Sequence, residues 1–155
     1  MDSINKTDNF VFQTYQRQGK ALVRGEGVYL WDEDGKKYID FLAGIAVVSL
    51  GHCHPKITEA ISRQASTLVH VSNLFYTMPQ ADLASKLCEK SFADRVFFAN
   101  SGAEANEAAI KLSRRYFQKK GEKDRFKIIT MEQSFHGRTM ATLTATGQDK
   151  IKDGF

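Results

Sequence analysis

Hydrophobic residues gather in two short runs near the start of the chain, at residues 28–32 and 37–41. The aromatic and β-branched side chains of both runs favour strands. The Asp-Gly pair within residues 33–36, between the runs, is a strong turn signal. The pattern therefore predicts a β-hairpin, and the glycines within residues 24–27 exclude a helix just ahead of it.

From residue 42 to residue 94 the hydrophobic spacing changes to that of helices. Pro55 and Pro79 both suit the first turn of a helix, so we expect one helix to start at Pro55 and another near Pro79. The residues that we expect to face the interior from these helices are Ile57, Ile61, Leu68, Leu83 and Leu87.

Residues 95–131 give the clearest pattern. A short apolar run at 95–99 predicts a buried strand, residues 102–120 predict a helix, and residues 126–131 predict a second strand. Strand, helix and strand in this order form a βαβ unit with a right-handed crossover. We therefore predict an α/β fold. Since two strands do not make a stable sheet alone, we also expect the domain to be incomplete at residue 155.

Composition excludes several classes of protein. Lys and Arg exceed Asp and Glu by only 22 to 18, and no basic stripe is interleaved with aromatic residues, so nucleic acid is not an expected partner. No apolar run approaches the roughly 20 residues that span a bilayer, and no signal-peptide core is present, so we expect no membrane association. Cys53 and Cys88 form no disulfide framework, which indicates a cytoplasmic, reduced protein.

Residues 100–104 come after the first predicted strand and open the predicted helix. Sheets in α/β proteins place ligands at this edge, and a helix N-terminus offers free amides and partial positive charge to a phosphate. Gly102 and Ala103 keep the approach free of bulk. The alternative is that Ser101 and Glu104 form a capping box, which any helix can use. Both interpretations stay open.

Residues 134–139 follow the second predicted strand and so should reach the same edge of the sheet. Phe135 could offer a flat face to an aromatic ring. Arg138 could present its planar fork to a carboxylate, with Gly137 allowing a tight turn between them. The alternative is a core phenylalanine and a solvated arginine, but two such elements at one edge favour a ligand site.

Two rival interpretations remain. Zinc could bind a cluster of His52, Cys53, His54 and His70. Pro55 follows at once and no second ligand pair exists, so we predict no metal site. A non-enzymatic binding or assembly module could instead use the apolar residues 74–76 as a partner surface. Phe135 and Arg138 would then have no purpose, which disfavours this interpretation.

Four motifs in order resemble those of the class III (ornithine-type) aminotransferases: residues 25–32, residues 44–47 leading to 51–55, residues 100–107 and residues 134–139. The resemblance extends from about Phe12 to Phe155. The sequence Gly-Ile-Ala-Val at residues 44–47 resembles that of the acetylornithine branch, whereas the ornithine branch tends to place tyrosine at the position of Ile45.

This resemblance implies an α/β fold of the fold-type I class, a homodimer and the cofactor pyridoxal 5′-phosphate. It implies that residues 1–50 contribute to a small domain, that residues 51–155 begin the large cofactor-binding domain, and that residues 73–76 lie near the dimer interface. It also implies site residues: Ser101, Gly102 and Ala103 for the cofactor phosphate, Phe135 for the cofactor ring, Arg138 for a substrate carboxylate, and Tyr15 and Ile45 for the substrate pocket.

The implied reaction moves the terminal amine of N2-acetyl-L-ornithine to 2-oxoglutarate, a step of arginine biosynthesis. Ornithine, succinylornithine and 4-aminobutyrate are the alternative amine donors. In the family, the lysine that binds the cofactor and the aspartate that keeps its ring nitrogen protonated both lie downstream of residue 155. We therefore expect no catalytic residue within these 155 residues, and expect them to be an inactive piece when isolated.

Overall fold

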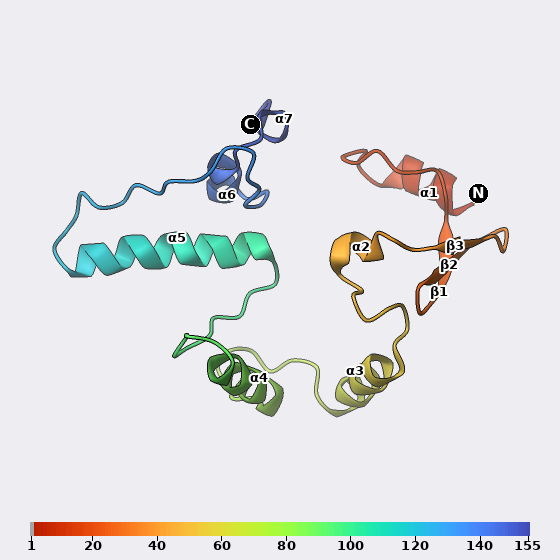
Figure 1. Ribbon diagram of the computed structural model, residues 1–155, viewed down its shortest axis with the longest axis horizontal. Coiled ribbons are helices and arrows are strands. Elements are labelled where there is room, and N and C mark those ends of the chain that lie inside the picture. The colour runs from red at the N-terminus through yellow and green to blue at the C-terminus, as the bar shows by residue number, and fades with distance from the viewer. Residues whose placement is uncertain (1) are drawn as a thin grey trace. The chain divides into compact units, whose positions relative to one another are not determined.

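The computed structural model describes residues 2–155 (Figure 1). The chain divides into two compact units, one up to Phe75 and one from Tyr76 to Phe155. The expected division at residue 50 between a small and a large domain stays a prediction about the complete protein.

The first unit is built around a three-stranded antiparallel sheet in the order β1-β2-β3. Its strands are β1 (Leu22–Glu26), β2 (Tyr29–Asp32) and β3 (Lys37–Ile39). The predicted hairpin is confirmed, because β2 and β3 pair through Tyr29 with Ile39 and Leu30 with Tyr38. Gly35 in the connecting turn has a φ of 77°, a conformation that glycine adopts without strain.

Within residues 2–75, three helices accompany the sheet: α1 (Ser3–Phe10), α2 (Ala43–Ala46) and α3 (Pro55–Thr67). The helix predicted from Pro55 is confirmed. Helix α1 was not predicted. It is capped by the Asp2 side chain, which accepts a hydrogen bond from the amide of Asn5 at 2.8 Å.

The second unit contains α4 (Met78–Glu89), α5 (Gly102–Lys119), α6 (Met140–Ala145) and α7 (Asp149–Lys152). The starts predicted near Pro79 and at Gly102 are confirmed. The strands predicted at 95–99 and 126–131 are wrong for the described residues, where the antiparallel sheet is the only one. A strand exists through its ladder of hydrogen bonds, and these two segments do not pair with each other.

Burial is sparse within residues 2–155. Leu143 is the buried hydrophobic residue, and Thr142 and Thr146 beside it are fully buried. The side chains predicted to face inward from α3 and α4 are instead exposed, with Ile61 at 64% and Leu83 at 48%. The best-packed region is therefore α6 with its surroundings, where α6 contacts α5.

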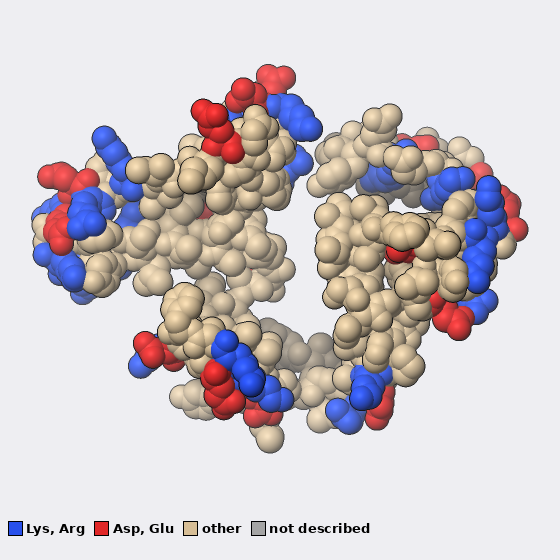
Figure 2. Space-filling model, in the orientation of Figure 1, with Lys and Arg blue, Asp and Glu red and all other residues tan. Residues whose placement is uncertain are grey.

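Charge is spread over both units. In the view of Figure 2, Lys and Arg side chains lie beside Asp and Glu side chains instead of forming one continuous basic stripe. Across residues 2–155, no helix combines the length and the apolar character that crossing a lipid bilayer requires.

Candidate functional site

The turn that opens α5 carries a variant of the capping box, in which the Glu104 side chain reaches back to the amide of Asn100 instead of that of the N-cap Ser101. Ser101 is the N-cap, and its hydroxyl accepts a hydrogen bond from the amide of Glu104 at 3.2 Å. The Glu104 carboxylate accepts one from the amide of Asn100 at 2.6 Å. The amides of Gly102 and Ala103 have no acceptor among residues 2–155. The cap and an anion site are therefore compatible, because the cap leaves two adjacent donors free.

The space in front of these donors is open. A Cβ atom built on Gly102 would meet no atom within 4 Å. Helix α5 has 18 residues, so its aligned peptide dipoles place about half a positive charge at this end. A phosphate group fits such a turn, since it needs hydrogen-bond donors, positive potential and close access to the backbone.

Residues 134–139 lie directly against the start of α5. A Cβ on Gly137 would be 2.7 Å from the Cβ of Ala103, so the two backbones are in close contact there. The side-chain amide of Asn106 donates to the carbonyl of His136 at 2.7 Å. The Thr139 hydroxyl donates to the Glu107 carboxylate at 2.5 Å. The second motif thus reaches the helix start, as the sequence predicted, although through α5 itself and not through a parallel sheet.

Phe135 and Arg138 are neighbours within this loop. The guanidinium carbon of Arg138 lies 5.7 Å from the centre of the Phe135 ring. The Phe135 side chain is 54% exposed, and Arg138 forms no ion pair among the described residues. The Phe135 ring and the Arg138 guanidinium, which contact each other, are therefore both accessible to a ligand in the loop that packs against the start of α5.

Buried hydroxyls of α6 and of Thr146, the residue that follows it, hold the loop in place. The Thr142 hydroxyl donates a hydrogen bond to the carbonyl of Thr139 at 3.0 Å, and the two threonine hydroxyl oxygens lie 2.8 Å apart. The Thr146 hydroxyl accepts a hydrogen bond from the amide of His136 at 3.1 Å. The sequence analysis assigned no role to Thr142 and Thr146, and it used Asn106 and Glu107 only as part of the motif at residues 100–107. No pattern in the sequence marks these supporting roles, because they depend on how α5, α6 and the loop pack together.

Tyr15 and Ile45 both belong to the first unit. Tyr15 is 66% exposed and lines an open pocket of about 500 Å³ next to α1. Ile45 is 82% exposed and has a φ of 59° within α2. Their expected place in the substrate pocket stays a prediction.

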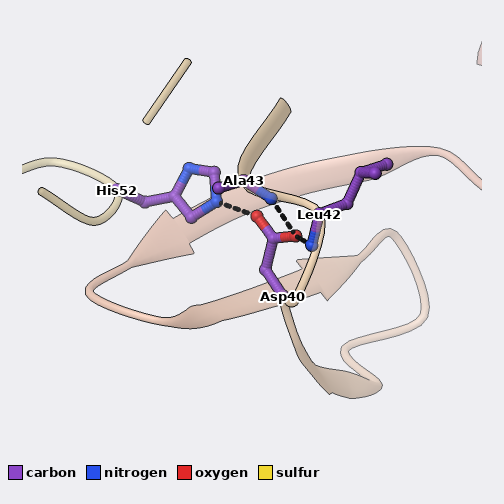
Figure 3. A network of polar contacts seen from close by, with 4 residues as sticks. All are labelled: Asp40, Leu42, Ala43 and His52. Atoms are coloured by element: carbon purple, nitrogen blue, oxygen red, sulfur yellow. Dashed lines mark hydrogen bonds and ion pairs between the residues drawn. The ribbon is translucent and has the colours of Figure 1, made fainter. Parts of the chain in front are cut away.

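His52 takes part in a polar network, which Figure 3 shows. Its ring Nε2 lies 2.6 Å from one oxygen of the Asp40 carboxylate, and the other oxygen accepts hydrogen bonds from the amides of Leu42 and Ala43. The hydrogen bonds from His52 and Ala43 lower the pKa of Asp40. Within residues 2–155, no group of three or more His, Cys, Asp and Glu side chains gathers as a metal site would require.

The profile of a family described as Aminotransferase class-III matches residues 13–155. Among curated proteins, the acetylornithine aminotransferase of Caldanaerobacter subterraneus subsp. tengcongensis is 56% identical over 94% of this chain. The acetylornithine aminotransferase of Methanocaldococcus jannaschii is 53% identical over 98% of it. The chain spans 37% and 38% of the lengths of these two relatives.

Solved structures agree in fold. One structure of the ornithine aminotransferase from Toxoplasma gondii, in which PLP partly occupies the active site, matches with a TM-score of 0.89 and 31% identity. The match covers 97% of this chain and 36% of that protein. This likeness confirms the predicted α/β fold class.

Proposed function

The chain belongs to the class-III aminotransferase family, and on that premise we propose that it forms the cofactor-phosphate and carboxylate-binding part of a transaminase. The proposed enzyme moves the terminal amine of N2-acetyl-L-ornithine to 2-oxoglutarate in arginine biosynthesis, as a cytoplasmic homodimer. The names of the two relatives at 56% and 53% identity support this choice of substrate.

The proposed cofactor is pyridoxal 5′-phosphate, which when bound supplies the electron sink for amine transfer. Ser101, Gly102 and Ala103 would hold its phosphate, and the observation that carries this proposal is the pair of free amides at Gly102 and Ala103. Phe135 would pack against the cofactor ring and keep water from that face. Arg138 would bind a substrate carboxylate remote from the reacting amine. Its guanidinium forms no ion pair among the described residues and lies next to the Phe135 ring.

The substrate pocket would be completed by Tyr15 and Ile45. An aliphatic side chain at position 45 lacks a hydroxyl and so leaves the wall less polar, which favours an acylated amine over ornithine. Such a change discriminates by only about 1–3 kcal/mol. Ornithine, succinylornithine and 4-aminobutyrate are therefore the competing donors to be tested.

The lysine and the aspartate that the cofactor requires would come from sequence outside these 155 residues. Among residues 2–155, the side-chain hydrogen bonds between α5 and residues 136–139 are made by Asn106, Glu107 and Thr139, and none involves a lysine. We propose that the isolated chain does not transaminate. One sample of the isolated chain is mixed with pyridoxal phosphate and reduced with borohydride, and a second, unreduced sample is assayed for turnover. A stoichiometric lysine adduct in the first together with turnover in the second would contradict the proposal.

The test of function uses the complete protein that carries this chain. Glutamate formation is measured from 2-oxoglutarate with N2-acetyl-L-ornithine, L-ornithine, N2-succinyl-L-ornithine and 4-aminobutyrate as donors. We expect the highest kcat/KM for N2-acetyl-L-ornithine. A higher value for another donor would move the assignment within the family, and the absence of turnover with every donor would favour a non-catalytic binding module.

A further inference from the structure

The turn that carries Ile45 has an unusual backbone. Four consecutive residues have positive φ: Ala43 at 49°, Gly44 at 62°, Ile45 at 59° and Ala46 at 63°. Residues with a Cβ atom disfavour this region, because the side chain approaches the following carbonyl. Such a turn persists only when its surroundings fix it. The position of the exposed Ile45 side chain therefore depends on the contacts that hold the turn.

Asp40 fixes the entry to this turn. One oxygen of its carboxylate accepts hydrogen bonds from the amides of Leu42 and Ala43, both at 2.9 Å (Figure 3). The turn is closed by the amide of Ala46, which donates to the carbonyl of Leu42 at 3.0 Å. Moving the Asp40 carboxylate would release the two residues that lead into the strained turn.

His52 in turn fixes Asp40. Its ring Nε2 lies 2.6 Å from the second carboxylate oxygen, and the two side chains are only 20% and 8% exposed. The backbone of His52 pairs with Gly27 through two hydrogen bonds, at 2.9 and 2.7 Å. A Cβ on Gly25 would come within 2.7 Å of the His52 side chain, so the ring is packed directly on β1. The sheet thereby sets the position of the ring, and the ring sets that of the carboxylate.

The same sheet contains a matching arrangement that serves as an internal control. One oxygen of Asp32 accepts hydrogen bonds from the amides of Asp34 and Lys36, and the other accepts one from the Tyr38 hydroxyl at 2.6 Å. This second carboxylate also caps a turn and also has a ring partner. Its turn, however, carries no residue assigned to the substrate pocket.

We propose that Asp40 and His52 are positioning residues that hold Ile45 as a wall of the substrate pocket and so set the preference between acylated and free amine donors. The inference rests on the proposed function, which assigns Ile45 to that pocket. Neither side chain is required to touch substrate or cofactor, because the effect passes through the backbone of residues 42–46.

The test is a double-mutant cycle in the complete protein, because coupled residues give non-additive effects. The quantity measured is the ratio of kcat/KM for N2-acetyl-L-ornithine to that for L-ornithine. Ile45→Ala and Asp40→Asn are each expected to lower this ratio by about fivefold or more. In the Asp40→Asn protein, Ile45→Ala should change it by less than about twofold. Tyr38→Phe should leave the ratio within about twofold, and Ile45→Ala should keep its full effect in that background.

His52 provides a second route if Asp40→Asn does not fold. His52→Ala removes the ring contact and should lower the same ratio, and His52→Gln, which restores a donor at similar reach, should recover it. An unchanged ratio with equal loss of activity for both donors would show a merely structural role and overturn the inference. So would full additivity of Asp40→Asn with Ile45→Ala. A wild-type protein that transaminates neither donor would contradict the proposed function itself, whereas the other failures contradict only this inference.

Discussion

Gly137→Ala probes the contact on which the proposed cofactor site depends. A Cβ at this position would lie 2.6 Å from the Thr142 hydroxyl oxygen, 2.7 Å from the Ala103 Cβ and 3.0 Å from the Ala103 Cα. Gly137 also has a φ of 137°, which residues other than glycine rarely adopt. The substitution therefore combines a steric clash with backbone strain.

The free-energy cost of Gly137→Ala is the sum of the steric clash and the backbone strain. Overpacking typically costs about 1–3 kcal/mol, and a strained φ adds on the order of 1–3 kcal/mol. The cheapest relief is for residues 134–139 to move away from α5, since Ala103 is part of the helix backbone. That movement would displace the loop that carries Phe135 and Arg138 from the start of α5. We expect a loss of at least tenfold in affinity for pyridoxal phosphate and a higher KM for 2-oxoglutarate, since tenfold corresponds to about 1.4 kcal/mol.

The assay is a titration of the complete protein with pyridoxal phosphate, followed by absorbance and fluorescence, beside a thermal unfolding curve. Gly121→Ala is the matched control: its φ is 84°, but a Cβ there would meet no atom within 4 Å. It should lose stability through backbone strain alone and keep cofactor affinity. Equal cofactor affinity in the Gly137→Ala and Gly121→Ala proteins would show that the contact between Gly137 and Ala103 does not govern cofactor binding.

Two further predictions concern the helix start and the Asp40 network. Gly102→Ala should raise the free energy of unfolding by up to about 1 kcal/mol, because alanine is the better helix residue. It should also weaken cofactor binding, because the added methyl group lies in the open approach to the amides. Thermal unfolding should therefore show a more stable protein, and titration with pyridoxal phosphate a lower affinity. The pKa of Asp40 is lowered in the folded protein from 3.8, so its stabilising contribution is present above that pH and lost as the pH falls toward the folded value. Melting temperature measured from pH 6 down to pH 2 should fall less steeply for Asp40→Asn than for the wild-type protein, and parallel curves would contradict this.

Much of the fold follows from local signals in the sequence. Prolines at 55 and 79, the Asp-Gly turn and Ser101 before Gly102 each act within one or two turns of chain, and each marked its element correctly. The runs at 95–99 and 126–131 failed as strands because a strand needs a pairing partner that an apolar run does not specify. The burial predicted for the run at 95–99 is also wrong, since Phe97 is 72% exposed. Helix α1 was missed because its sequence, SINKTDNF, has no apolar stripe and its cap is a single aspartate.

The residues of the candidate site that would contact a ligand could be predicted from the sequence, whereas the residues that hold them in position could not. Ser101, Phe135 and Arg138 stand in recognisable motifs. Asn106 holds His136 across 30 positions of sequence, and His52 reaches Asp40 across 12. Such contacts depend on how the elements pack, and no pattern of hydrophobic or polar residues along the chain specifies them.

The most direct test is a crystal structure of the complete protein with pyridoxal phosphate bound. We predict phosphate oxygens within about 2.7–3.2 Å of the amide nitrogens of Gly102 and Ala103, with the Phe135 ring against the pyridine ring. A phosphate bound elsewhere, with these two amides facing only water, would show that the start of α5 is not the cofactor-phosphate site.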